Sequence, residues 1–227
     1  DVALYGHITL DRIFNDFKKD QTIGSIGNVW KHLNKLNPLL SLYIEPTDVG
    51  EALIFINQKT SERASIANLS LFTKSPTLKK SNWSHILYLN QLEDPSFIRD
   101  IQSRIISADI CRGEPIKDLE VLRDIDFLFL SDEDEFLSPK DILKFVKIGL
   151  ILHDPSGSTY YGKDGTVLRN KVEIVDNVNV LGCGDMLAAG FINYYLLQND
   201  IGSSLRRSHE EITKVLMNQK RRASGNA

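Results

Sequence analysis

The chain has 227 residues, of which 42% are hydrophobic and 25% charged, a composition typical of a soluble globular domain with a sizeable core. Its 27 basic and 30 acidic side chains leave a net charge of −3, so it lacks the strong basic field of a general nucleic-acid-binding protein. No apolar run approaches the roughly 20 residues that span a bilayer, and no signal peptide leads the chain. Two cysteines cannot form a disulfide framework, and these features together predict a cytoplasmic protein. The sequence begins at Asp1 without a methionine, so we expect a few leading residues to be missing.

The first part of the sequence predicts two strands and a helix. Residues 1–5 are short and apolar and are followed by Gly6, which predicts a buried strand ending in a turn. Apolar side chains at helical spacing predict a helix over 28–36, which Asn37-Pro38 ends. Residues 39–44 form a second apolar run.

Residues 51–56 and 64–72 flank a polar turn and predict a β-hairpin. The first arm is apolar on both faces, so it requires cover on both sides. One interpretation is a lid over about 51–72 that projects from the domain and is covered by a second copy of the chain, giving a homodimer. The other interpretation is a central strand of the main sheet.

The rest of the chain alternates between short apolar and polar segments. Four apolar runs predict buried strands: 85–89, 104–108, 127–130 and 149–152. Polar, helix-compatible stretches separate them: 95–103, 116–123 and 139–147. This alternation predicts an α/β fold with three layers, α/β/α, around a mainly parallel sheet.

The C-terminal third predicts an antiparallel edge and two helices. Three short strands are expected at 159–161, 166–168 and 172–175, joined by turns containing Lys163-Asp164-Gly165 and Arg169-Asn170. Helices are expected at 182–197 and 203–219. We therefore expect one domain over 1–219, with the lid inserted, and a basic, disordered tail at 220–227.

The most informative segment is the glycine pair of Gly182-Cys183-Gly184-Asp185 at the start of an apolar helix. Small residues at a helix start leave backbone N–H groups uncovered, and together with the helix dipole these groups form an anion site. Asp185 in the first turn is a candidate general base beside that anion, an arrangement suited to phosphoryl transfer.

A purely structural interpretation of the same residues remains open. Glycines allow close packing at helix starts, and an aspartate there complements the dipole by about 0.3–1 kcal/mol. The segment is neither a Walker A loop, because no Lys-Ser/Thr follows, nor a dinucleotide fingerprint, because Leu187 occupies the third glycine position.

The run from Gly182 to Asp185, followed by Ala188-Ala189-Gly190-Phe191, resembles the C-terminal signature of ribokinase-like (PfkB-type) carbohydrate kinases. The resemblance implies a ribokinase-like fold in which Gly182, Cys183 and Gly184 form an anion hole and Asp185 is the catalytic base. It also implies ATP and Mg²⁺ as cofactors and a sugar or nucleoside as the acceptor.

Weaker similarities occur in the same order along the chain. Gly6 and Asp11 resemble the end of the family's first strand and its sugar-binding aspartate. The segment Gly24-Ser25-Ile26-Gly27-Asn28 resembles a second acceptor-binding element, with Ser25 where the family has a glycine. The resemblance implies acceptor-binding roles for Asp11, Gly24 and Asn28, although Asp11 also fits a turn or cap and Asn28 a plain N-cap.

The acidic run Asp132-Glu133-Asp134-Glu135 follows a predicted strand and resembles the family's Asn-x-x-Glu element. This implies that Glu135 and Asp132 organise magnesium, which needs only one or two carboxylates. Without a metal, the same carboxylates would favour the N-terminus of the following helix.

The nucleotide side departs from the family pattern. The expected Thr-x-Gly-x-x-Gly turn is replaced by Leu152-His153-Asp154-Pro155-Ser156-Gly157, so Gly157 is the one glycine that remains and His153 is a further candidate. Arg63, on the hairpin turn, is a candidate phosphate or sugar ligand or a solvated charge. No histidine pair has the spacing of a zinc site, and no nearby histidine supports Cys183 as a nucleophile.

Together these observations predict an ATP-dependent sugar or nucleoside kinase. Two alternatives remain: a non-catalytic sugar-binding or regulatory protein on the same fold, and a sugar nucleotidyltransferase whose metal site is the acidic run. The sequence does not identify the acceptor.

Overall fold

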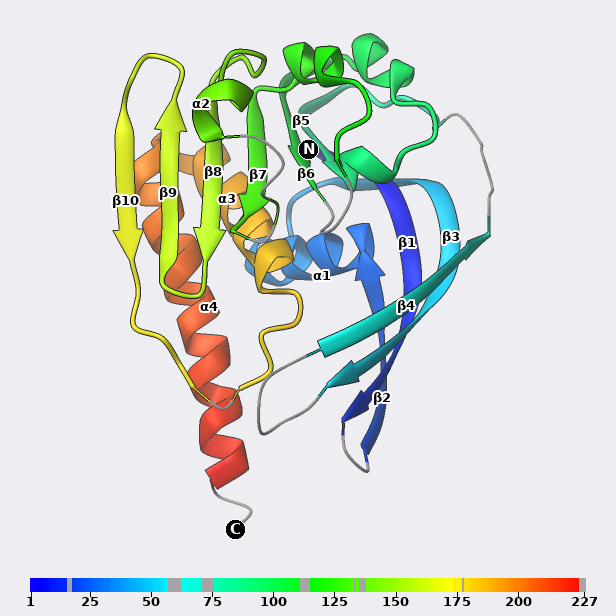
Figure 1. Cartoon of the computed structure of the whole chain (residues 1–227), viewed down its shortest axis with the longest axis vertical. Coiled ribbons are helices and arrows are strands. Elements are labelled where there is room, and N and C mark those ends of the chain that lie inside the picture. The colour runs from blue at the N-terminus through cyan, green and yellow to red at the C-terminus, as the bar shows by residue number, and fades with distance from the viewer. Residues whose placement is uncertain are drawn as a thin grey trace.

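The computed structural model describes residues 1–15, 18–56, 63–70, 76–110, 115–132, 134, 138–176 and 178–224. Within these residues, ten strands form one sheet in the order β10-β9-β8-β7-β6-β5-β1-β3-β4, with β2 paired to β1 (Figure 1). The strands are β1 (Val2–Asn15), β2 (Lys18–Ser25), β3 (Leu42–Ile56), β4 (Arg63–Ser70), β5 (Ser81–Leu87), β6 (Ser103–Asp109), β7 (Phe127–Ser131), β8 (Gly149–Asp154), β9 (Gly157–Gly162) and β10 (Val167–Lys171).

The sheet is parallel through its centre and antiparallel at its edges. Strands β3, β1, β5, β6, β7 and β8 pair in parallel, whereas β9 and β10 close one side and β2 and β4 the other with antiparallel pairing. The α-helices are α1 (Ile26–Leu36), α2 (Pro139–Ile142), α3 (Cys183–Gln198) and α4 (Ile201–Ser224), and the 3-10 helices are η1 (Leu89–Gln91), η2 (Ser96–Asp100) and η3 (Leu119–Asp124). The fold is the predicted three-layer α/β/α arrangement around a mainly parallel sheet.

Each face of the sheet has its own apolar core, because side chains alternate along every strand. On one face, Trp83, Phe127 and Phe191 of α3 pack together, with ring centroids 5.8 Å apart for Trp83–Phe127 and 5.3 Å for Phe127–Phe191. On the other face, Tyr5 and Leu128 pack under the segment of η2 and η3. Helix α3 is apolar almost all round because it lies between the sheet and its neighbours α1 and α4.

Strand β1 does not end at Gly6, as the sequence predicted, but continues to Asn15. Gly6 has a φ of 134°, and a Cβ at this position would overlap the carbonyl oxygen of Leu87 on β5. The glycine therefore serves a close approach between two strands instead of a turn. Similarly, residues 42–44 of the run predicted at 39–44 and the whole run predicted at 51–56 belong to the single strand β3, whereas residues 39–41 precede it.

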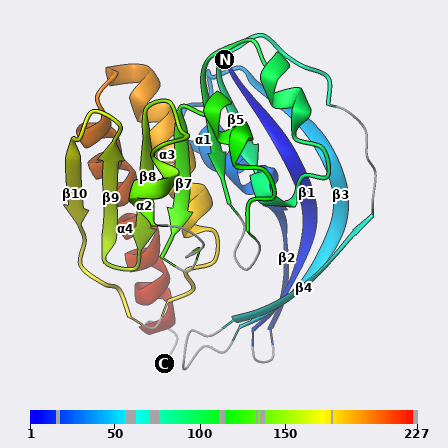
Figure 2. The same cartoon turned by 45° about the horizontal axis from the view of Figure 1, so that its top comes forward.

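The far halves of β1 and β3 leave the main sheet and carry β2 and β4 on their outer sides (Figure 2). The predicted hairpin is confirmed over β3 and β4, which pair from Val49–Ser70 to Ile56–Arg63. Strand β2 was not predicted. We call these four strand segments the projecting sheet: residues 8–15 of β1, β2, residues 49–56 of β3, and β4.

Other predictions differ in detail from the structure. The helix-compatible stretches 95–103, 116–123 and 139–147 contain only short helices, η2, η3 and α2. Residues 172–175 are not a strand, and Arg169-Asn170 lie inside β10 instead of in a turn. The tail predicted to be disordered at 220–227 is helical up to Ser224, the end of α4, where Arg221 and Arg222 complement the negative end of the helix dipole; residues 225–227 lie outside the described residues. None of the described helices combines the length and apolarity needed to cross a bilayer.

Candidate active site

The start of α3 has the geometry of an anion site. Gly182 is the N-cap, with a φ of 78° that favours glycine. Gly184, in the first turn, has no carbonyl partner within the helix for its N–H group, and the positive end of the helix dipole lies here. The N–H of Cys183, by contrast, donates to Val180 O at 3.1 Å. The Cys183 N–H, one of the donors expected for the anion site, is therefore already used in the preceding turn.

Asp185 lies in a contact between two helix N-termini. Asn28 Nδ2, in the first turn of α1, donates to Asp185 Oδ2, in the first turn of α3, at 2.9 Å. Asp185 is 7% exposed, and a Cβ on Gly182 would lie 3.7 Å from both of these polar atoms. The positive ends of two helix dipoles thus converge on one carboxylate.

Asp11 forms a second polar cluster on the projecting sheet. Thr9 Oγ1 donates to Asp11 Oδ1 at 2.6 Å, and both side chains are buried. Burial raises the pKa of Asp11, and the Thr9 hydroxyl partly offsets this shift. A Cβ on Gly24 would overlap the Asp11 carboxylate and the Thr9 hydroxyl, so the glycine makes room for these groups. The short segment from Gly24 to Asn28 therefore links Asp11 to Asp185.

The sequence analysis missed Asp109, the last residue of β6. Its pKa is raised well above the usual value, first because it is buried and then because Asp185 and, to a smaller degree, Asp134 place negative charge nearby. Its carboxylate accepts a hydrogen bond from the Ile110 N–H at 2.7 Å. The available signal was its position after a buried parallel strand, since ligand sites of α/β sheets lie at the carboxyl ends of strands.

The acidic run after β7 is only partly described. Asp134 is buried, and its Oδ2 accepts hydrogen bonds from Ser131 N at 2.7 Å and Ser131 Oγ at 2.8 Å. Asp132 is exposed, and its N–H donates to His153 O. The predicted metal ligand Glu135 lies outside the described residues. Among those that are described, no cluster of three or more His, Cys, Asp or Glu residues could hold a metal ion.

Magnesium does not require such a cluster, because it keeps several waters and uses one or two carboxylates together with substrate phosphates. The negative charges of Asp185 and Asp134 lie close enough to Asp109 to raise its pKa. The residues present therefore fit a phosphate-bound magnesium ion held partly through water.

His153, at the carboxyl end of β8, lies against the start of α3. A Cβ on Gly184 would be 3.4 Å from His153 Cε1 and 3.5 Å from its Nε2. Burial lowers the pKa of His153 to about 4, with a further contribution from His209 of α4 that outweighs Asp154. His209 in turn lies 2.9 Å from Ser158 Oγ. A neutral imidazole thus borders the anion site.

Gly157 has a structural explanation. Its φ is 137°, and a Cβ there would overlap the carbonyl oxygen of Asn170 on β10. The pairing of β9 with β10 therefore requires glycine here whether or not a nucleotide binds. Arg63 is the other peripheral candidate. The structure describes its backbone position at the start of β4 but not its side chain.

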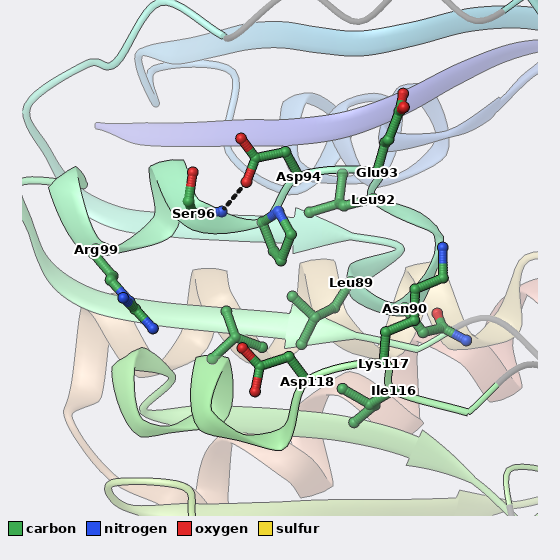
Figure 3. A pocket seen from close by; sticks show the side chains of 12 residues that line it. Leu89, Asn90, Leu92, Glu93, Asp94, Ser96, Arg99, Ile116, Lys117 and Asp118 are labelled. Atoms are coloured by element: carbon green, nitrogen blue, oxygen red, sulfur yellow. Dashed lines mark hydrogen bonds between the residues drawn. The ribbon is translucent and has the colours of Figure 1, made fainter.

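A separate cavity of about 370 Å³ lies between the η1–η2 segment and η3 (Figure 3). Its lining includes Leu89, Arg99, Lys117 and Asp118. None of the predicted catalytic or acceptor-binding residues contributes to it.

A mainly parallel α/β/α body with a projecting sheet, and an aspartate that follows a glycine pair at the start of a late helix, defines a ribokinase-like fold. Comparison with solved structures supports this class. A pyrophosphate-dependent kinase of the ribokinase family, complexed with a pyrophosphate analogue and myo-inositol, superposes with a TM-score of 0.69 at 16% identity, covering 92% of each chain. A Burkholderia thailandensis nucleoside kinase in complex with inosine gives 0.65 at 13% identity, over 92% of this chain and 88% of that one.

Arabidopsis thaliana ribokinase, complexed with ribose and ATP, gives a TM-score of 0.62 at 12% identity, over 91% of this chain and 89% of the other. No protein-family model and no curated protein sequence matches the chain. At these identities the comparisons establish the fold, and the chemistry is argued from the residues.

Proposed function

We propose that the chain is a phosphotransferase that moves the γ-phosphoryl group of ATP to a hydroxyl group of a small polyhydroxylated molecule, a sugar or a nucleoside. The observation that carries this proposal is the Asp185–Asn28 contact at 2.9 Å, where two helix N-termini meet beside the glycine pair. A carboxylate held in a fixed orientation next to an anion site is what an attacking hydroxyl needs in order to lose its proton.

In the proposed reaction, Asp185 accepts the proton of the acceptor hydroxyl as the hydroxyl oxygen attacks the γ-phosphorus. The bond from that phosphorus to the bridging oxygen breaks, and ADP leaves. The Gly184 N–H and the α3 dipole stabilise charge on the transferring phosphoryl oxygens. Asn28 holds Asp185 in place, and Asp11 with Thr9 orients the acceptor beside Gly24.

Magnesium, when bound with the donor, would neutralise charge on the phosphate oxygens. The proposed residues on this side are Asp132, Glu135 and the buried Asp134, whose charge helps to raise the pKa of Asp109. His153 and Gly157 mark the proposed donor side next to Gly184.

The donor needs its own test, because one structural neighbour is described as pyrophosphate-dependent and another is described in complex with ATP. Gly157 is explained by strand packing, so it does not by itself support a nucleotide. We propose ATP as the donor. Parallel assays with ATP and with pyrophosphate, each with Mg²⁺, distinguish the two donors by the release of ADP or of phosphate.

The decisive experiment compares Asp185→Asn with the wild type across ribose, inosine and myo-inositol as acceptors. We expect kcat to fall by about 10²–10⁴-fold, because general base catalysis contributes about that factor. Asp141→Asn is the matched control, since this acid lies on α2 in an exposed ion pair with Lys144 and should retain full turnover. Unchanged turnover in Asp185→Asn would remove the proposed mechanism.

The same assays separate the alternatives. Acceptor binding without turnover on either donor would favour a sugar-binding protein on this fold, for which the strand-packing role of Gly157 is the supporting observation. Release of pyrophosphate from ATP would favour a nucleotidyltransferase.

We further propose that a second copy of the chain covers the outer face of the projecting sheet. Large apolar side chains are exposed there, among them Ile66 at 67% and Phe55 at 46%. Arg12 and Glu51 form an ion pair of 2.8 Å on the same face. In a two-fold contact the same patch on each copy faces its counterpart. A patch that carries both a basic and an acidic side chain is therefore complementary to itself.

Sedimentation velocity of the wild type and of Phe55→Glu tests this contact. We expect a dimer for the wild type and a monomer for the variant. Leu39→Glu, at a 95% exposed position outside that sheet, should remain dimeric. A monomeric wild type at micromolar concentration would refute the proposal.

A further inference from the structure

The mechanism above leaves one buried polar side chain next to the acceptor site without a role. His7 follows Gly6 on β1 and is 2% exposed. Its Nδ1 lies 3.1 Å from the Asp48 carboxylate, and within the described part of the chain its buried Nε2 has no hydrogen-bond partner. Buried polar atoms are normally satisfied, so His7 requires an explanation.

The alternation of β1 places His7 on the face that carries the acceptor-binding candidates. Side chains two residues apart on a strand share a face, and the hydrogen bond between Thr9 and Asp11 shows this for the next two positions. Further along the same row, Ile13 packs against the cluster of Ala52, Ile54 and Ile56 of β3, and Leu181, just before the glycine pair, packs against the same cluster. The row therefore faces the start of α3.

Asp48 holds the His7 ring from the neighbouring strand. His7 lies opposite Asp48 at an irregularity in the register between β1 and β3, a feature that re-aims side chains. Asp48 Oδ2 lies 3.1 Å from His7 Nδ1 and accepts a hydrogen bond from Thr47 Oγ1 at 3.0 Å. Asp48 is 9% exposed.

The charge state of the ring follows from these surroundings. Burial lowers the pKa of His7, and this effect outweighs the opposing influence of the Asp48 carboxylate. The ring is therefore neutral at neutral pH. A carboxylate beside Nδ1 favours the tautomer with its proton on Nδ1, which leaves Nε2 as a hydrogen-bond acceptor.

We propose that His7 is a specificity-determining residue of the acceptor site, whose Nε2 accepts a hydrogen bond from a hydroxyl of a polyhydroxylated acceptor while Asp48 orients the ring. This inference rests on the proposed function in placing the acceptor against the Thr9–Asp11 row. It adds a position at the root of the projecting sheet that recognises one hydroxyl of the acceptor. The hydroxyl that would receive the phosphoryl group, beside Asp185, is a different one.

Two polar substitutions of similar size test this role against a merely structural one. His7→Gln carries its amide to the position of Nε2, whereas His7→Asn carries its amide only to the position of Nδ1, beside Asp48. If His7 reads the acceptor, Asn should weaken acceptor binding roughly tenfold, the effect of one lost hydrogen bond, and Gln should stay close to the wild type. If His7 only partners Asp48, the order of the two variants is reversed.

The measurement is isothermal titration of ribose, inosine and myo-inositol into the full chain in the absence of any phosphoryl donor. Binding then reports on the acceptor site independently of phosphoryl transfer, so a failure of the proposed kinase activity and a failure of this inference are distinguishable. Melting temperatures of both variants check that they fold. In turnover assays His7→Asn should raise the acceptor KM and leave kcat at saturating acceptor nearly unchanged.

Equal acceptor affinity in the wild type and His7→Asn overturns the inference. So does a loss of affinity in His7→Gln with Asn unaffected, or the absence of binding of all three probes to the wild type.

Discussion

The proposed acceptor side and the proposed donor side of the candidate site use glycine for different reasons. On the acceptor side, Gly24 lacks a side chain so that the Asp11 carboxylate and the Thr9 hydroxyl can lie over it. On the donor side, Gly157 lacks a side chain so that β10 can approach β9. The first arrangement leaves polar groups gathered for a ligand, whereas the second satisfies the sheet itself. The acceptor side therefore provides the stronger functional argument.

The largest effect is expected on the donor side, from Gly157→Ala. The substitution combines a positive φ with overlap against a backbone carbonyl, and we expect a loss of about 3 kcal/mol in the free energy of unfolding. Urea denaturation measures this loss. Gly165→Ala is the control, since φ is 89° there but no atom lies within 4 Å of the added Cβ, so about 1 kcal/mol of strain should remain. Equal losses would contradict the strand-packing explanation.

On the acceptor side, Gly24→Ala should act on binding more than on folding. The new methyl group displaces the Asp11 and Thr9 side chains, which are flexible at their ends. We expect the acceptor KM to rise roughly 30-fold, corresponding to about 2 kcal/mol, with the donor KM unchanged. Steady-state kinetics with each substrate varied in turn checks this. A change in the donor KM alone would reverse our assignment of the two sides.

The pH dependence of stability should be dominated by histidines such as His153. Its pKa is about 4 when folded against an ordinary 6.5, because burial disfavours the charged ring. As the pH falls, the ring is protonated in the unfolded chain before it is protonated in the folded chain. The free energy of unfolding therefore decreases from about pH 6.5 to pH 4, by up to about 1.4 kcal/mol per pH unit. Urea titrations at pH 7 and pH 5 should show a shallower dependence for His153→Gln. If the free energy of unfolding of His153→Gln depended on pH as steeply as that of the wild type, the assignment of this dependence to His153 would be wrong.

The smallest effect is expected for Asp109→Asn. The folded pKa of Asp109 is raised, so its contribution to stability is lost as the pH rises from about 4 toward that pKa. Asparagine removes the buried acid, and we expect a small gain in the free energy of unfolding at pH 7. Asp164→Asn, where the carboxylate accepts from the Thr166 N–H, should give no gain. A destabilised Asp109→Asn would show that its charge is needed for folding.

Local patterns in the sequence were sufficient to predict the parallel body and the start of α3. Apolar runs alternate with polar segments because each buried strand needs cover on both faces. The segment from Gly182 to Asp185 is informative because its chemistry depends on a few consecutive residues. Asp11 and Asn28 were proposed from family resemblance, and the structure ties Asn28 to Asp185 and surrounds Asp11 with Thr9 and Gly24.

The features that were missed depend on distant neighbours. Gly6 resembles a turn residue until the carbonyl of Leu87 is seen beside it. Strand β2 has mostly polar residues because it is an edge strand of the projecting sheet, so it shows no buried period. Asp109 and His7 acquire meaning only when Asp185 and Asp48, 76 and 41 residues away in sequence, are brought next to them.

The continuity of β1 and β3 has a mechanical consequence. Both strands run without a break from the body into the projecting sheet, and their pairing shifts between Gly6 and His7. A sheet joined in this way does not swing like a loop on a hinge. Admission of a small molecule would instead involve a change in the twist of the sheet at that shift. A displacement of the far end of the projecting sheet would therefore alter the position of the His7 ring at its base.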